Sequence, residues 1–273
     1  MELIEILKVV VLGIVEGVTE WLPISSTGHM LLVDEFIHMN VSESFKDMFF
    51  VVIQLGAILA VVMLFWDKMW PFQTKDKSKP VIRKDVFSMW FKVVVACIPG
   101  AIVTLLFDDY IEAHLHTPTV IALALVVYGV AFIVIENWNK NRTPKVLTLE
   151  DISYKTAFII GLFQVLSIIP GTSRSGSTII GALTIGVSRV AAAEFTFFLA
   201  VPVMIGLSLV KILKFGFSFT SVELITLAIG CVVAFLVSVL VIKFLMSYIK
   251  KRDFKIFGWY RIVLGVILLL YFM

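Results

Sequence analysis

Six long runs of apolar residues limit what this chain can fold into. They cover residues 49–66, 86–107, 118–135, 190–210, 222–248 and 256–273. A helix of about 20 apolar residues crosses the hydrocarbon core of a membrane, and a helix satisfies its own backbone hydrogen bonds there. The composition agrees, because 60% of the 273 residues are hydrophobic and only 16% are charged. The sequence therefore predicts an all-α integral membrane protein with six transmembrane helices.

Two further apolar segments are each interrupted by polar residues, glycine and proline. Residues 3–22 and 29–38 predict two short helices around the breaker Pro23-Ile-Ser-Ser-Thr-Gly28. Residues 156–169 and 179–187 predict two more around the loop 170–178. None of these pieces is long enough to span a membrane alone. They predict two re-entrant helix-loop-helix hairpins, which are stable only where protein or a wet cavity surrounds the loop.

The order of these elements predicts a duplication within one membrane domain, residues 1–273. The first half, 1–138, has the hairpin 3–38 and three spans, and the second half, 150–273, has the hairpin 156–187 and three spans. Gly13-Ile-Val-Glu16 resembles Gly161-Leu-Phe-Gln164, and each precedes a proline and a Ser/Thr/Gly loop. An odd number of spans in each half gives the halves inverted topology. Paired interrupted helices in inverted repeats are typical of a site at the membrane midplane.

The distribution of lysine and arginine predicts the orientation in the membrane. The segments 67–85, 139–155 and 249–255 hold 14 of the 23 Lys and Arg residues. Positively charged loops are usually cytoplasmic, so these three segments are expected on the cytoplasmic side. The first hairpin would then enter the membrane from outside and the second from inside.

The segment Pro170-Gly-Thr-Ser-Arg-Ser-Gly-Ser-Thr178 has the chemistry of an anion site. Backbone N–H groups in such a loop can face a phosphate, and the next helix directs its positive end there. The planar guanidinium of an arginine donates two hydrogen bonds to a phosphoryl group. The candidate phosphate-binding residues are Gly171, Ser173, Arg174 and Thr178. The alternative is a connector outside the bilayer with a solvated Arg174. Arg189 and Arg261 are less specific and are expected to snorkel to the surface or to pair locally.

Glu16 and Glu20 are four residues apart, so both carboxylates lie on one face of the first helix. Like charges at this spacing repel each other, and apolar surroundings remove their hydration. A shared proton, a metal ion or Arg174 could compensate. The alternative is a helix at the membrane surface with both acids in water.

Ser26 and His29 follow these acids at once, in Ile24-Ser-Ser-Thr-Gly-His29. A serine, a base and an acid together satisfy the general arrangement of an activated nucleophile. In one hypothesis Ser26 attacks phosphorus while His29 takes its proton. In the other, a metal ion or a carboxylate activates water, and Ser26 only donates a hydrogen bond to the phosphate.

The motifs Glu16-Gly-Val-Thr-Glu20, Pro23-Ile-Ser-Ser-Thr-Gly-His29 and Pro170–Thr178 resemble the signature motifs of the undecaprenyl-pyrophosphate phosphatases, the bacitracin-resistance protein family. The resemblance extends to chain length and to the pattern of spans. It implies hydrolysis of a C55 polyprenyl diphosphate to the monophosphate and inorganic phosphate. By motif position, the functional residues it implies are Glu16, Glu20, Ser26, His29, Ser173, Arg174 and Thr178.

The same resemblance implies a requirement for a divalent cation, Mg²⁺ or Ca²⁺, for which Glu16 and Glu20 are the candidate ligands. It implies a location in the bacterial plasma (inner) membrane with the active site toward the extracytoplasmic face. The expected partners are the polyprenyl diphosphate substrate and membrane lipids, and a homodimer is an alternative to a single copy. A net charge of +3 is too small to indicate nucleic-acid binding. The main alternative function is a lipid-phosphate flippase or transporter, because inverted repeats with broken helices are typical of transporters.

Overall fold

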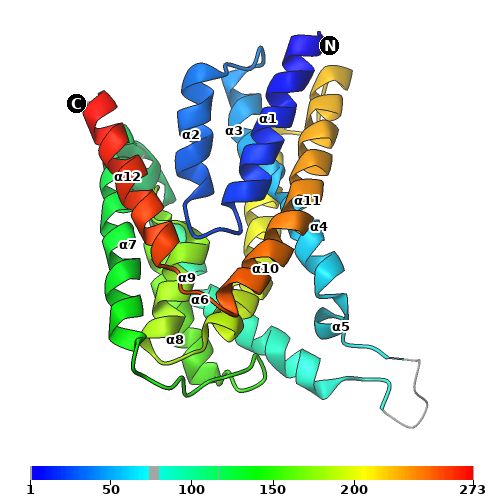
Figure 1. Cartoon of the computed structure of the whole chain (residues 1–273). Helices are drawn as coiled ribbons and strands as arrows, with labels where there is room; N and C mark the ends of the chain where they lie inside the picture. Colours follow the sequence, from blue (N-terminus) through cyan, green and yellow to red (C-terminus); the bar gives the residue numbers. More distant parts are fainter. Residues whose placement is uncertain (1, 74–79, 116, 273) are drawn as a thin grey trace.

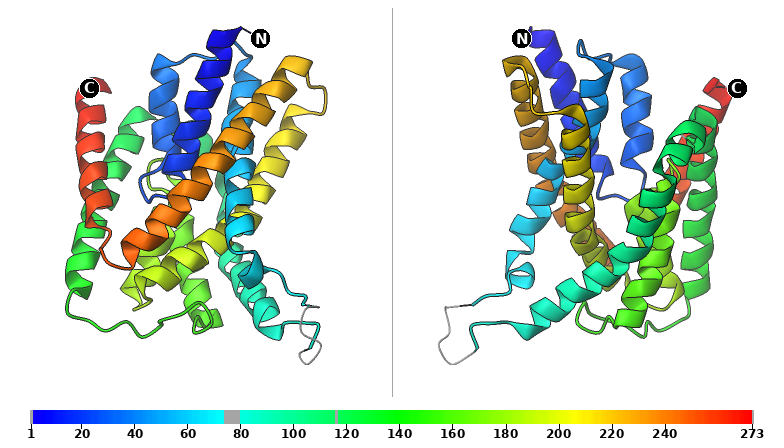
Figure 2. Two further views of the ribbon diagram at one scale, coloured as in Figure 1. Left: turned by 45° about the vertical axis from the view of Figure 1, so that its right-hand side comes forward. Right: turned by 180° about the vertical axis from the view of Figure 1, so that it is seen from behind.

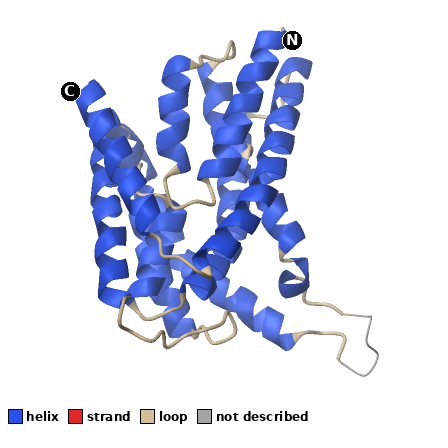
Figure 3. Ribbon diagram, viewed as in Figure 1, coloured by secondary structure: helices blue, strands red, loops and turns tan. Residues whose placement is uncertain are grey.

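The structure is a computed structural model that describes residues 2–73, 80–115 and 117–272. Helices build nearly all of it (Figures 1 and 3). Within these described ranges, six helical segments are long and apolar enough to cross a membrane: Glu43–Leu64, Lys84–Phe107, Pro118–Asn139, Arg189–Phe215, Ser221–Ile249 and Lys255–Phe272. The prediction of an all-α membrane protein with six spans is confirmed.

The first of these spans consists of two helices, α3 (Glu43–Val52) and α4 (Gln54–Leu64), which meet at Ile53 and are followed by the short helix α5 (Trp66–Met69). The remaining spans lie in α6 (Lys84–Leu115), α7 (Pro118–Asn139), α10 (Arg189–Phe215), α11 (Ser221–Ile249) and α12 (Lys255–Phe272). The helix α6 extends beyond its apolar run, residues 86–107, to Leu115. No glycine or proline stands between Phe107 and Thr117 to end the helix earlier.

The first hairpin consists of α1 (Leu3–Thr19) and α2 (Ser26–Phe36). In Figure 1 both helices run from the upper end of the molecule to a turn at about half its height. The structure begins α2 at Ser26, three residues before the predicted start at residue 29. The reason is local, since Ser25 acts as the N-cap and its side chain accepts a hydrogen bond from Gly28 N at 3.3 Å.

The second hairpin consists of α8 (Tyr154–Val165), a 3₁₀ turn (Leu166–Ile168) and α9 (Arg174–Thr184). The prediction of a loop over 170–178 is wrong in its second part, because Arg174–Thr178 forms the first turns of α9. Here Ser173 is the N-cap and its side chain accepts from Gly176 N at 3.1 Å. Arg174 therefore projects from the N-terminus of a helix and not from an irregular loop.

Each hairpin packs against a long helix of the other half of the chain. The first helix α1 packs along α11, and α8 packs along α6. The contacts are close at two glycines: a Cβ at Gly13 would lie 2.9 Å from Val233 Cβ, and one at Gly161 would lie 2.3 Å from Ala96 O. These are the two glycines that the sequence repeat places in equivalent positions. The close approach agrees with a duplication, while the inverted topology and the boundaries of the halves stay predictions.

Both chain termini lie at the same end of the molecule, as the views in Figures 1 and 2 agree. The connections after α7 and after α11 lie at the opposite end (Figure 2). These connections contain the basic segments 139–155 and 249–255. The positive charge of the chain is thus gathered at one end of the bundle, as the orientation argument requires.

Candidate active site

The turns of the two hairpins meet inside the bundle, and each turn has the same unusual backbone. Ser25 and Ser173 are the residues other than glycine with positive φ among those described, at 76° and 70°. A side chain other than glycine in this region costs free energy, and such strain is common at functional sites. In each turn this serine is the N-cap of the helix that follows.

Glu20 joins the two turns through its carboxylate. Its Oε1 accepts a hydrogen bond from Arg174 Nη2 at 3.0 Å, and its Oε2 accepts one from Ser26 Oγ at 2.6 Å. The side chains of Arg174 and Glu20 are only 10% and 6% exposed. One carboxylate therefore holds the cation of the second motif and the hydroxyl of the first, in surroundings that contain little water.

Arg174 is held from its other side by α10. Its Nη1 donates to Thr196 O at 2.9 Å, while its Nε is buried and has no hydrogen-bond partner within the described part of the chain. Thr178 Oγ1 lies 2.9 Å from Arg174 O and 2.9 Å from Thr196 Oγ1. In this conformation the Thr178 hydroxyl is used to connect α9 to α10. It orients Arg174 and does not point freely into the site.

His29 lies beside the same turn but does not bond to Ser26. Its Nδ1 is 2.7 Å from Ser25 O, and its Nε2 is 2.7 Å from Tyr260 Oη. Because a carbonyl only accepts, Nδ1 carries a proton, and a neutral ring then accepts the Tyr260 proton at Nε2. The hypothesised pairing of Ser26 with His29 is therefore not found. The group within reach of the Ser26 proton is Glu20.

Arg261, on α12, connects the two turns, a role that its local sequence does not indicate. It is 0% exposed. Its Nη1 donates to Pro23 O at 3.0 Å, and its Nη2 donates to Gly171 O and Thr172 O, each at 2.7 Å. The expectation that Arg261 snorkels or pairs locally is wrong, since its partners are carbonyls of both distant turns. Arg189 does form a pair, with Glu136, at 2.5 Å between Nη2 and Oε2.

Tyr260 was also missed, because nothing in its local sequence distinguishes it from an interfacial tyrosine of the last span. It stacks on His29 with 5.6 Å between the ring centroids and 7° between the ring planes. On α12, Tyr260 therefore contacts the first turn through His29, and its neighbour Arg261 contacts both turns. Only the long-range packing of α12 on α7 brings them there.

Gly171 and Ser173 shape the second turn. Gly171 has φ of 92°, and a Cβ there would lie 2.5 Å from Ile121 O, so only glycine fits between the turn and α7. Ser173 Oγ lies 3.0 Å from Ser175 Oγ in addition to its capping bond. Both residues define the path of the turn that presents Arg174.

Glu16 is the remaining acid of the first motif, and it is 1% exposed. Among the residues that the structure describes, neither of its carboxylate oxygens has a hydrogen-bond partner. A buried ionised carboxylate without a partner is strongly unfavourable. The carboxylate of Glu16 is therefore free to bind either a proton or a cation. These are two of the three ways to offset its buried charge that the sequence leaves open. Arg174 pairs with Glu20 instead.

The chain is similar to known proteins over nearly its whole length. The family described as "Bacitracin resistance protein BacA" matches residues 9–267. A protein of Enterococcus faecalis named undecaprenyl-diphosphatase is 74% identical over 270 residues, covering 99% of this chain and 98% of that protein. Proteins with the same name from Lachnoclostridium phytofermentans and Desulfitobacterium hafniense are each 62% identical over 273 residues, covering 100% of this chain and 99% and 98% of theirs.

Proposed function

The chain belongs to the bacitracin resistance protein family, and from that premise we propose that it is a membrane phosphatase that hydrolyses undecaprenyl diphosphate. The products are undecaprenyl phosphate and inorganic phosphate. This reaction returns the lipid carrier of cell-wall synthesis to use and gives resistance to bacitracin. The names of the relatives support the substrate, and the bond of Glu20 to both Arg174 and Ser26 supports the chemistry.

In the proposed mechanism Arg174 binds the phosphoryl oxygens and neutralises their charge. Ser26 Oγ attacks phosphorus while its proton passes to Glu20, 2.6 Å away. The new Oγ–P bond forms as the phosphoanhydride bond breaks, and undecaprenyl phosphate leaves. Water then attacks the phosphoserine, inorganic phosphate leaves, and Glu20 returns a proton to the serine oxygen.

His29 has a positioning role in this scheme. Its bonds to Ser25 O and Tyr260 Oη fix the turn that carries Ser26. Arg261 does the same for both turns at once. Such fixed geometry lowers the barrier because the reacting groups are already oriented.

A divalent cation, Mg²⁺ or Ca²⁺, is part of the proposal, and the orphaned carboxylate of Glu16 supports it. Glu16 and Glu20 would hold the ion, which when bound screens the charge of the diphosphate. The described residues contain no group of three or more His, Cys, Asp or Glu side chains that could hold a metal. Glu16 and Glu20 are therefore the two candidate ligands that the chain offers at this site.

The decisive experiment measures phosphate release from undecaprenyl diphosphate by purified protein, with rapid-quench trapping of labelled substrate. Ser26→Ala should remove almost all activity, and Glu20→Gln should lower kcat by about 10²–10⁴-fold. Ser218→Ala and Glu35→Gln, at exposed positions, are the matched controls. Two results together would rule out serine attack. The wild-type protein would carry no label after trapping, and Ser26→Ala would keep more than a tenth of the wild-type activity. Water would then be the attacking nucleophile, with Glu20 as the general base.

The alternative, a flippase or transporter, is supported by the meeting of two interrupted helices inside the bundle. A protein that only moves lipid phosphate across the membrane releases no inorganic phosphate in detergent. The same assay with wild-type protein therefore separates the two functions.

A location in the bacterial plasma membrane, with the site open to the extracytoplasmic side, completes the proposal. Its support is the collection of basic segments at the end of the bundle opposite the open end of the α1–α2 hairpin.

A further inference from the structure

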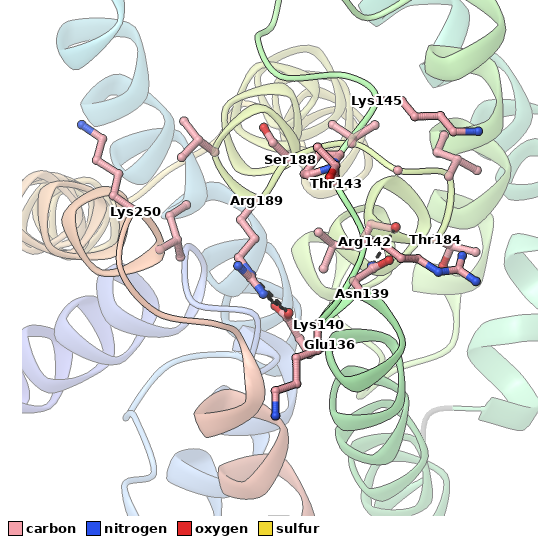
Figure 4. A pocket seen from close by; sticks show the side chains of 17 residues that line it. Glu136, Asn139, Lys140, Arg142, Thr143, Lys145, Thr184, Ser188, Arg189 and Lys250 are labelled. Atoms are coloured by element: carbon pink, nitrogen blue, oxygen red, sulfur yellow. Dashed lines mark hydrogen bonds and ion pairs between the residues drawn. The ribbon is translucent and has the colours of Figure 1, made fainter.

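A pocket of about 560 Å³ lies at the basic end of the bundle, away from the hairpin turns. It is formed by the ends of α7, α9 and α11, the start of α10 and the segment that follows α7 (Figure 4). Arg174 begins α9 and the pocket residues Leu183 and Thr184 end it. Eleven helical residues, at about 1.5 Å each, separate the pocket from the active site by roughly 15 Å. It is therefore a second site and not an extension of the first.

The pocket carries an excess of positive charge. Five cationic side chains line it, and Glu136 is its acid; the five are Lys140, Arg142, Lys145, Arg189 and Lys250. The Glu136 carboxylate is already used, since it accepts from Arg189 Nε and Nη2 and from Phe254 N. No ion pair within the described part of the chain neutralises the three lysines. An anion would restore the balance of charge.

The walls of this pocket are held in place. The segment before Leu147 is hydrogen-bonded to the connection between α9 and α10. Lys145 N and Val146 N both donate to Gly186 O, and Ser188 N donates to Val146 O. Arg189 is fixed by Glu136 at the base, as Figure 4 shows. Two of the lysines, Lys140 and Lys145, lie in the segment after α7, and Lys250 directly follows α11. All three are exposed, and their side chains extend outward on different sides of Arg189 (Figure 4). Their flexible stems let the ammonium groups turn over a bound anion.

The level of the pocket in the membrane indicates where such an anion comes from. Trp138, near the end of α7, is 45% exposed, and the Arg142 guanidinium lies 3.7 Å from the centre of its ring. Exposed tryptophans at the end of a span lie at the level of lipid headgroups. Basic pockets between transmembrane helices on the cytoplasmic side are typical binding sites for anionic headgroups. A volume of 560 Å³ also exceeds the space of one free phosphate ion.

We infer that this pocket binds the phosphate-bearing headgroup of an anionic membrane lipid. Arg189 gives a fixed cation at the base, and Lys140, Lys145 and Lys250 surround the phosphate at the rim. The bound lipid ties together α7, α9, α10 and α11 at the end of the bundle. It does so without taking part in hydrolysis.

The test compares delipidated protein with phosphatidylglycerol, phosphatidylcholine and inorganic phosphate as probes. Native mass spectrometry counts bound lipid, and the thermal midpoint reports stabilisation. Wild-type protein should retain phosphatidylglycerol in preference to phosphatidylcholine. The double variant Lys145→Gln/Lys250→Gln should bind phosphatidylglycerol about tenfold to thirtyfold more weakly. The control Lys84→Gln/Lys155→Gln makes the same charge change at exposed residues outside the pocket.

Equal loss in both double variants would show a general effect of surface charge and would overturn the inference. So would equal binding of the two lipids by wild-type protein. Stabilisation by millimolar inorganic phosphate but not by phosphatidylglycerol would overturn the lipid origin of the anion. Phosphatase activity should stay near the wild-type level in both double variants in excess substrate. This confirms that each variant is folded, independently of lipid binding.

Discussion

The Glu20 carboxylate balances a guanidinium and a hydroxyl that come from opposite halves of the chain. In surroundings this dry, each charge-assisted hydrogen bond contributes more than it would in water. The same pairing orients Arg174 and Ser26 before any substrate arrives. Glu16, next to it on the helix, has no such partners, so the two acids of the first motif have different tasks.

Arg174→Lys should lower kcat/KM by about tenfold to a hundredfold. An ammonium keeps the charge but cannot bond to Glu20, to Thr196 O and to a phosphate with the planar geometry of the guanidinium. Each lost charge-assisted bond contributes about 1.5–3 kcal/mol. Steady-state kinetics measures the change, and Lys211→Arg is a conservative control outside the site. Near-wild-type turnover of a folded Arg174→Ala variant would contradict the phosphate-binding role.

Glu16→Gln should raise the concentration of Mg²⁺ or Ca²⁺ needed for half-maximal activity. The amide keeps the shape of the side chain but removes the charge that attracts the ion. The change in this concentration is measured by titrating each metal into protein that a chelator has stripped of metal. The variant Glu35→Gln, at an exposed position, is the control. Wild-type activity that is indifferent to chelator would eliminate the metal role. Glu16 would then hold a proton.

At the scale of elements, the capping serines determine where the catalytic helices begin. Ser25 and Ser173 each bond to the N–H group three residues on, so α2 and α9 start at Ser26 and Arg174. The spans, the hairpins and the two motifs could be predicted, because apolar runs and glycine-rich turns are local signals. The helix starts were misplaced because glycine and serine after the cap were interpreted as loop residues.

The contacts of α12 could not be predicted in this way. Arg261 and Tyr260 lie in an apolar run near the C-terminus, and their partners are Pro23, Gly171 and His29. Such pairs depend on the packing of α12 against α7, which includes a glycine contact at Gly129 and Gly258. No periodicity or spacing in a single sequence indicates them.

Arg261→Lys should loosen both hairpin turns together. A lysine lacks the fork that reaches Pro23 O on one side and Gly171 O on the other, so at least one buried carbonyl loses its donor. An unsatisfied buried polar group costs about 1–3 kcal/mol. We expect a lower thermal midpoint and faster hydrogen exchange in residues 22–25 and 170–173, with kcat reduced more than KM rises.

The control for Arg261→Lys is Arg252→Lys, at an exposed position beyond α11. Hydrogen exchange that increases in one turn only would contradict the idea that Arg261 couples the two. Exchange that is unchanged in both turns, with lower activity, would indicate that Arg261 acts on the substrate directly.

For the whole molecule, the one-sided distribution of basic segments predicts a single orientation in the membrane. The basic segments 139–155 and 249–255 lie at the end away from both termini (Figure 2). Moving such segments to the outside of a membrane is unfavourable, so they should face the cytoplasm. In this predicted orientation the α1–α2 hairpin would open to the outside, and the diphosphate of a lipid in the outer leaflet would reach Glu20 and Arg174 without crossing the membrane.

This orientation predicts how single cysteines react in intact cells. In a background with Cys97 and Cys231 replaced by alanine, Ser44→Cys, in the first turn of α3, should react with a thiol reagent that does not cross membranes. Asn141→Cys, just after α7, should react only after the cells are opened. Both positions are exposed, so a difference between them reports the side of the membrane and not burial. If Asn141→Cys reacts in intact cells and Ser44→Cys does not, the site opens to the cytoplasm, and the basic pocket faces the outer leaflet instead.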